Sequence, residues 1–310
     1  PQTKGFSMSL KLRGTYTALI TPFTADGEKV DWAALKQLVE RQIDAGVEGL
    51  VPCGTTGESP TLSHEEHAEV IAKVIEWAKA KNPTCVVIAG TGSNSTSEAI
   101  SLTKAAAAAG ADAVLSVNPY YNKPVQAGLT LHFQKIADAS KVPVILYNIP
   151  GRSAVGMTVD TIQALAKHGN IAAIKEATGD LGFMAQVIQA TEGKLALLSG
   201  DDNLIVPVLS IGGVGVISVI SNVYPKETGD ITRDYFAGRQ ADAQKKFLKL
   251  LPLCKAMFIE TNPIPVKFAA AKKGICENSL RLPMTPLSKS LEATLISAME
   301  SFEAAGVVRG

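Results

Sequence analysis

The stretch Ile171-Ala172-Ala173-Ile174-Lys175-Glu176-Ala177-Thr178 joins an apolar run of strand length to a lysine and then to a polar loop. A short, continuous apolar run is typical of a strand that is buried on both faces of a parallel sheet. Burying a lysine at the end of such a strand is costly, and the loss of water favours its neutral amine, which attacks carbonyl carbons to form Schiff bases. For Lys175 taken alone, a head group that reaches solvent is the alternative.

The same unit recurs along the chain, because short apolar runs end in polar loops marked by Gly or Pro and helical patterns follow. The predicted strands are residues 16–20, 49–53, 86–90, 113–117, 144–147, 172–175, 195–199 and 215–218. Amphipathic segments such as 32–45, 65–81 and 97–109 lie between them. Eight strand–helix units predict an α/β fold, a (β/α)₈ TIM barrel, whose chemistry gathers at the carboxyl ends of the strands.

The alternative fold is a doubly wound open sheet, whose dinucleotide-binding version needs a Gly-rich fingerprint after its first strand. Thr21-Pro22-Phe23 follows the first predicted strand, and Ser95 stands where Gly90-Thr91-Gly92 would need its third glycine. We interpret Gly212-Gly213-Val214-Gly215 as a tight, closely packed turn rather than a phosphate-binding loop.

After about residue 225 the helical patterns 226–237, 239–258, 265–273 and 286–305 follow one another without an intervening strand pattern. This predicts a C-terminal helical appendage. The expected division is an expression remnant at 1–7 before Met8, a catalytic barrel over 8–235 and a helical domain over 236–310.

Composition is that of an ordinary globular chain, with 310 residues, 46% hydrophobic and 19% charged. A formal net charge of +1 offers no electrostatic case for nucleic acid or an anionic membrane, and no apolar run reaches the roughly 18–20 residues of a membrane span. The four cysteines, at positions 53, 85, 254 and 276, form no CxxC pair and are expected to be reduced and mostly buried, as in a cytoplasmic protein. His64 and His67 alone do not make a zinc site, so no metal is expected.

Four phrases occur in an order that resembles one family. They are Gly54-Thr55-Thr56-Gly57-Glu58, Asn118-Pro119-Tyr120-Tyr121, Tyr147-Asn148-Ile149-Pro150 and Ile174-Lys175-Glu176-Ala177-Thr178, and Asn262-Pro263-Ile264-Pro265-Val266-Lys267 follows them. The family is the pyruvate-dependent class I aldolases that include dihydrodipicolinate synthases and N-acetylneuraminate lyases. The resemblance covers nearly the whole chain, with Pro60 and Ser153 where alanine and threonine are commoner.

The resemblance implies a role for each residue of the site. Lys175 forms the imine with pyruvate and acts as the electron sink, so no cofactor is expected. Tyr147, Thr56 and Tyr121 relay protons, with Tyr121 acting across a subunit interface. Thr55 and Thr56 hold the pyruvate carboxylate, and the backbone at Gly200 and Ile217 lines the pocket. The alternative for the two threonines is a helix N-cap in a tight turn, a role compatible with binding.

Arg152 favours the branch of the family that condenses pyruvate with aspartate 4-semialdehyde to 4-hydroxy-tetrahydrodipicolinate for lysine and diaminopimelate synthesis. A guanidinium can bind the semialdehyde carboxylate through two N–H groups, whereas a solvated loop arginine is the alternative. Another pyruvate-dependent aldolase or lyase of the family is the alternative function, and a catalytically silent binding protein is a third.

The resemblance also implies inhibition by lysine in a cleft at a dimer interface. The matching residues are Ser59, His64, His67, Asn94, Glu98 and Tyr120. They are otherwise solvated polar residues around a helix cap and a loop. The expected assembly is a homotetramer built as a dimer of dimers, because Tyr121 needs at least a dimer.

Overall fold

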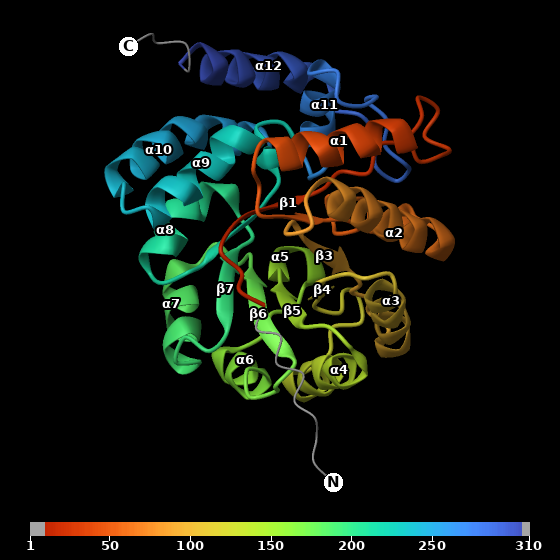
Figure 1. The fold of residues 1–310 in the computed structure, drawn as a ribbon, viewed down its shortest axis with the longest axis vertical. Helices are drawn as coiled ribbons and strands as arrows, with labels where there is room; N and C mark the ends of the chain where they lie inside the picture. The colour runs from red at the N-terminus through yellow and green to blue at the C-terminus, as the bar shows by residue number, and fades with distance from the viewer. Residues whose placement is uncertain (1–9, 306–310) are drawn as a thin grey trace.

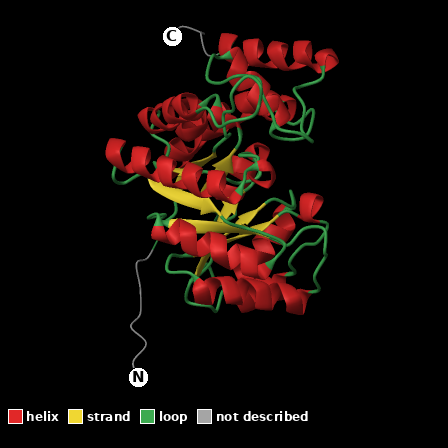
Figure 2. Cartoon of the chain, turned by 90° about the vertical axis from the view of Figure 1, so that its right-hand side faces the viewer, coloured by secondary structure: helices red, strands yellow, loops and turns green. Residues whose placement is uncertain are grey.

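The computed structural model describes residues 10–305. In this part of the chain, eight parallel strands close into a barrel in sequence order, and helices cover its outer face (Figures 1 and 2). The strands are β1 (Gly14–Ala18), β2 (Gly49–Val51), β3 (Val86–Gly90), β4 (Ala113–Val117), β5 (Val144–Asn148), β6 (Ile171–Glu176), β7 (Ala196–Ser199) and β8 (Gly215–Ser218). The predicted (β/α)₈ barrel is confirmed.

The helices follow the strands in alternation and then continue beyond the barrel. They are α1 (Trp32–Asp44), α2 (His64–Lys81), α3 (Thr96–Ala108), α4 (Gln126–Ala139), α5 (Pro150–Ser153), α6 (Val159–Leu165), α7 (Leu181–Ala190), α8 (Ile205–Ser210), α9 (Pro225–Phe236), α10 (Gln240–Ala256), α11 (Ile264–Lys272) and α12 (Lys289–Ala304). A capping box begins α2, where the side chain of Ser63 accepts from the Glu66 N–H and the side chain of Glu66 accepts from the Ser63 N–H.

The barrel closes where β1 pairs with β8, and glycine makes that closure possible. Gly14 lies opposite Gly215 in the register, and a Cβ atom on Gly215 would lie 2.0 Å from the carbonyl oxygen of Gly14. Gly212 has a φ of +103°, a conformation that L side chains rarely adopt. The interpretation of residues 212–215 as a turn and close-packing segment is therefore confirmed.

Alternate strand residues fill the inside of the barrel, and the opposite faces pack under the helices. The inner group comprises Leu12, Tyr16, Ala18, Val51, Ile88, Ala113, Leu115, Ile145, Tyr147, Ala173, Leu198 and Ile217. All are buried, so the barrel is a packed core that leaves only its carboxyl-terminal mouth for chemistry.

Element boundaries differ from the predicted ones where side chains compete for backbone groups. The first strand was predicted at 16–20 but ends at Ala18, because the N–H of Ile20 donates to Oδ1 of Asn222 at 3.0 Å. The last helix was predicted from Pro286 but begins at Lys289. Its preceding residue, Ser288, donates its N–H to the carboxylate of Glu260 at 3.2 Å, which holds the chain outside the helix.

Helices α10, α11 and α12 lie together at one side of the barrel (Figure 1). The division predicted at residue 235 remains a proposal; α9 ends at Phe236, and Gly238, with a φ of +81°, turns the chain into α10. The predicted expression remnant at 1–7 lies outside the described residues. None of the helices in the described chain is both long enough and apolar enough to cross a bilayer.

Candidate active site

Lys175 and Tyr147 lie side by side at the carboxyl ends of neighbouring strands. They are direct partners in the β5–β6 register, and Lys175 Nζ lies 4.1 Å from the centroid of the Tyr147 ring. Only 6% of Lys175 and 5% of Tyr147 are exposed. The aromatic face can stabilise the charged ammonium, and the pair brings a buried amine and a phenol together where β5 and β6 end.

The next strands leave room beside the lysine. Gly200 follows β7, and a Cβ atom added there would lie 3.2 Å from Lys175 Cε and 2.6 Å from the Cβ of Ala177. The adjacent Asp201 is a carboxyl that sequence reasoning did not identify; burial raises its pKa, and the positive charge of Lys175 partly opposes that rise. Ile217 is fully buried on β8 inside the barrel. The predicted pocket-lining role of Gly200 and Ile217 stays a prediction.

Thr55 and Thr56 lie in a tightly folded loop after β2. The Glu58 N–H donates to the Thr55 carbonyl at 3.1 Å, and Glu58 itself has a φ of +54°. Thr56 is 3% exposed, and its Oγ1 accepts a hydrogen bond from Asn262 Nδ2 at 2.9 Å. Glu58 and Ser63 occupy the N-cap positions of the next two helical segments, so the alternative that the threonines cap a helix is wrong.

A cavity of about 530 Å³ connects this loop to Arg152. Thr55, Arg152 and Asn262 line it together. Arg152 projects from the short helix α5, and its Nη2 donates to the backbone carbonyl of Asn262 at 2.9 Å. Arg152 is exposed, so its remaining N–H groups can meet a carboxylate that enters the cavity.

Most of the residues matched to a lysine site line the same cavity. They are Ser59, His64, His67, Glu98 and Tyr120. Asn94 lies beside them and donates to the carbonyl of Tyr120 at 3.1 Å. Hydrogen bonds from Ser93 and His64 hold the pKa of the Glu98 carboxyl below its usual value, so Glu98 carries a negative charge at neutral pH. Burial lowers the pKa of His67, which favours the neutral imidazole.

Tyr121 is placed differently from its predicted partners. Its side chain is 91% exposed, and its φ of +74° is uncommon for a residue other than glycine. The described chain therefore does not bring Tyr121 into the buried site with Tyr147 and Thr56. An exposed aromatic side chain on a strained loop fits a residue that acts in a neighbouring subunit.

A buried polar ladder behind Lys175 was not predicted. Asn118 Nδ2 donates to Asn148 Oδ1, and Asn148 Nδ2 donates to Glu176 Oε2, each at 2.8 Å. The second oxygen of Glu176 accepts from the Thr178 N–H at 2.7 Å. Burial raises the pKa of Glu176, against these hydrogen bonds. The ladder ties the ends of β4, β5 and β6 together; its only signal in the sequence was a polar residue at each strand end.

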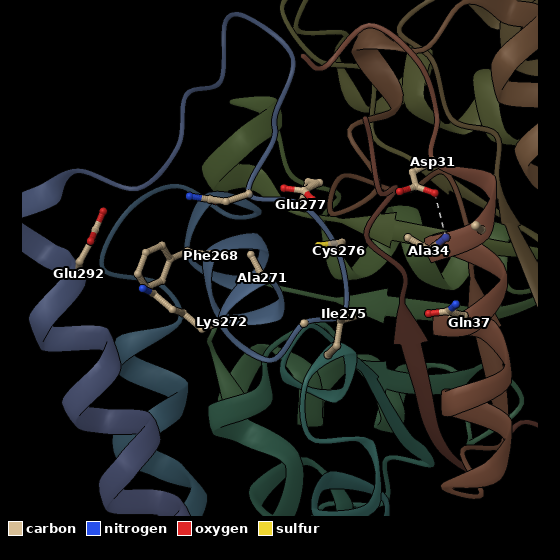
Figure 3. A pocket seen from close by; sticks show the side chains of 13 residues that line it. Asp31, Ala34, Gln37, Phe268, Ala271, Lys272, Ile275, Cys276, Glu277 and Glu292 are labelled. Carbon is tan, nitrogen blue, oxygen red and sulfur yellow. Dashed lines mark hydrogen bonds between the residues drawn. The ribbon is translucent and has the colours of Figure 1, made fainter. Parts of the chain in front are cut away.

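A second hollow, of about 640 Å³, lies between α1 and the segment that follows α11 (Figure 3). Asp31, Lys272, Cys276 and Glu277 are among its lining residues, and it contains none of the predicted site residues. Over residues 10–305, no group of three His, Cys, Asp or Glu side chains is placed to hold a metal ion.

Comparison with known proteins gives one family. A model of the dihydrodipicolinate synthetase family matches residues 11–301. The 4-hydroxy-tetrahydrodipicolinate synthase of Leptospira biflexa serovar Patoc is 54% identical over 291 residues, which cover 94% of this chain and 95% of that protein.

Two solved structures carry ligands. The dihydrodipicolinate synthase of Acinetobacter baumannii complexed with pyruvate is 42% identical, with a TM-score of 0.91 and coverage of 94% of this chain and 98% of that one. The enzyme of Cyanidioschyzon merolae with lysine bound is 40% identical, with a TM-score of 0.90 and coverage of 94% and 98%. This chain therefore belongs to the dihydrodipicolinate synthetase family.

Proposed function

We propose that the chain condenses pyruvate with aspartate 4-semialdehyde to 4-hydroxy-tetrahydrodipicolinate, through a Schiff base on Lys175. The observation that carries the proposal is the buried Lys175 amine, 4.1 Å from the ring centroid of Tyr147 at the barrel mouth. The relative from Acinetobacter baumannii, complexed with pyruvate, supports pyruvate as the first substrate.

The reaction follows from the chemistry of a neutral amine. Lys175 Nζ adds to the keto carbon of pyruvate, and water leaves to give a protonated imine. The imine draws electrons from the methyl carbon, which loses a proton and becomes an enamine. The enamine carbon bonds to the aldehyde carbon, and the aldehyde oxygen takes a proton. The amino group of the semialdehyde then displaces Lys175 from the imine carbon, which closes the ring and frees the enzyme.

Protons must reach and leave the substrate at each step. Tyr147 lies beside the amine, and Thr56 lies buried at the same mouth. We assign the third hydroxyl of the relay to Tyr121 of the partner subunit, which a hydrogen-bonded chain can connect to the site. Thr55 and backbone N–H groups of its loop hold the pyruvate carboxylate.

The surface around Tyr121 supports an oligomer. Tyr120, Tyr121, Val125 and Leu131 are all exposed in one stretch of the chain, with Val125 at 75% and Leu131 at 60%. Several exposed large hydrophobic side chains within one short stretch of chain fit a protein interface. We therefore propose a dimer that shares Tyr121, and a tetramer built from two such dimers. A cytoplasmic location belongs to the same proposal, since all four cysteines are free thiols.

Arg152 distinguishes this function from that of other pyruvate-dependent aldolases. Arg152→Ala removes a charge-assisted contact to the semialdehyde carboxylate. It should therefore raise the activation free energy that corresponds to kcat/KM for the semialdehyde by about 2–4 kcal/mol. Because Thr55 and its loop, rather than Arg152, hold the pyruvate carboxylate, the KM for pyruvate should change little. Initial rates with each substrate varied in turn give both constants, and equal changes for the two substrates would rule out the assigned role.

The activity itself is tested with the unaltered enzyme and a panel of aldehydes. Pyruvate with aspartate 4-semialdehyde should give the cyclic product, detected by mass spectrometry. N-Acetylmannosamine, the aldehyde that a sialic acid lyase joins to pyruvate, should give no condensation product. Turnover of that sugar in place of the semialdehyde would favour the alternative function.

We also propose that lysine inhibits the enzyme from the cavity lined by Ser59, His64, His67, Glu98 and Tyr120. The relative from Cyanidioschyzon merolae with lysine bound supports this, as does the anionic Glu98, which can pair with an ammonium. The same cavity reaches Thr55 and Arg152, so occupation can affect the catalytic loop.

Lysine titration of the initial rate should show inhibition at millimolar concentrations. Glu98→Ala should raise the half-inhibitory concentration of lysine by about tenfold or more, because it removes one charge-assisted contact to the ligand. Glu69→Ala, an exposed glutamate on α2 outside the cavity, is the matched control and should be inhibited like the parent. Equal inhibition of the parent and Glu98→Ala would contradict this site.

A further inference from the structure

Asn262 contacts two parts of the proposed site at once, from a segment far along the chain. Its side-chain Nδ2 donates to Thr56 Oγ1 at 2.9 Å, and its backbone carbonyl accepts from Arg152 Nη2 at 2.9 Å. Only 5% of the residue is exposed. The carbonyl contact does not depend on the side chain, so a substitution at Asn262 can remove the Thr56 contact alone.

A buried charged cluster holds this segment in place. Lys267, on α11, is fully buried; its Nζ lies 2.5 Å from Glu58 Oε1 and donates to the Ser279 carbonyl at 2.9 Å. Lys267 and Arg281 both lie over the ring of Phe23, at 4.0 and 4.3 Å from its centroid. Glu58 closes the loop that carries Thr56, so the cluster fixes Asn262 and Thr56 relative to each other.

Stability alone does not explain the asparagine at this position. Its Oδ1 is buried and has no hydrogen-bond partner in the described structure. A buried polar atom without a partner costs free energy of folding, and this cost offsets the hydrogen bond that Nδ2 gives to the buried Thr56 hydroxyl. The amide is therefore better explained by what its N–H does to Thr56.

We propose that Asn262 is a positioning residue that sets the direction of the Thr56 hydroxyl in the proton relay. Because Asn262 Nδ2 donates, Thr56 Oγ1 accepts on that side, and the Thr56 proton is directed away from Asn262 toward the relay. An acceptor in place of Nδ2 would draw the proton out of the relay. The inference rests on the proposed function, since it needs Thr56 to carry protons.

Asn262→Ala should lower kcat by about ten- to a hundred-fold, as for a disturbed proton relay. The KM values of both substrates should stay within about threefold of the parent, since the Arg152 contact remains. The urea unfolding midpoint should stay close to that of the parent, because loss of the hydrogen bond to Thr56 is offset by removal of the unpartnered Oδ1. Asn262→Asp should lower kcat further, because its carboxylate accepts a hydrogen bond from the Thr56 hydroxyl and so turns that proton away from the relay.

A double-mutant cycle with Thr56→Val separates positioning from packing. Once the hydroxyl is gone, adding Asn262→Ala should cause no further loss of kcat. Asn278→Ala is the matched control: it also has a buried, unpartnered Oδ1, but it lines the hollow of Figure 3, and its kcat should equal that of the parent.

Losses that multiply in the double variant, or an Asn262→Ala variant with parental kcat, would overturn the assignment. If Asn262→Ala unfolds at a lower urea concentration than the parent, Asn262→Ser, which leaves a smaller cavity, replaces it in the cycle. The same outcomes then support or overturn the assignment. Reductive trapping of pyruvate by the parent enzyme separates the two proposals. A parent that is not labelled contradicts the Schiff-base function, whereas a labelled parent with an additive cycle contradicts only the role of Asn262.

Discussion

Lys175→Ala should lower kcat for the condensation by at least about 10⁴-fold, since no other group supplies the nucleophile. The substitution removes the amine at the end of β6, while the strand keeps its apolar residues and its pairing with β5. Folding should therefore be retained, which circular dichroism and the unfolding midpoint check. Product formation measured at saturating pyruvate and semialdehyde gives the expected loss.

Two further variants sharpen this prediction. Lys175→Arg keeps a positive charge beside Tyr147 but cannot form an imine, so it should be as inactive as the alanine variant. Lys245→Ala changes an exposed lysine on α10 and should have parental activity. A Lys175→Arg enzyme with substantial turnover would show that charge, rather than covalent chemistry, is what Lys175 provides.

Tyr121→Phe should lower kcat by about ten- to a thousand-fold, the range expected for loss of a proton-relay group. The ring stays and only the hydroxyl is lost, at a side chain that is 91% exposed, so the unfolding midpoint should remain close to that of the parent. Tyr235→Phe, on α9, serves as the control for loss of a tyrosine hydroxyl away from the site. Steady-state rates compare the three enzymes.

The position of Tyr121 also predicts complementation. In a mixed oligomer of Tyr121→Phe and Lys175→Ala subunits, some sites combine an intact Lys175 with Tyr121 of the partner subunit. Subunit exchange between these two weak variants should therefore restore part of the parental rate. If exchanged oligomers, verified by mass spectrometry, gain no activity, Tyr121 acts within its own chain or not at all.

The fold could be predicted from sequence because each strand is a short apolar run followed by a polar loop. Lys175 stands out for the same reason: a lysine near the end of the run Ile171–Glu176 has few structural explanations. Strand and helix ends were less predictable. They depend on contacts such as Ile20 with Asn222, which are distant in sequence and leave no local pattern.

The residues of the candidate site also differ in how well the sequence predicts them. Residues in strand-end loops, such as Thr56 and Arg152, could be identified from their phrases. The role of Asn262 could not, because its contact with Thr56 joins residues 206 positions apart. The exposure of Tyr121 and the orphaned Oδ1 of Asn262 are likewise properties of the folded chain.

Reductive trapping shows whether pyruvate forms a Schiff base with Lys175. The parent enzyme is incubated with pyruvate and sodium borohydride, digested, and mapped by mass spectrometry. A Schiff base at Lys175 predicts one pyruvate-derived adduct per chain on that lysine, and none when borohydride or pyruvate is omitted. An adduct on a different lysine, or full activity without any adduct, would contradict a Schiff base at Lys175.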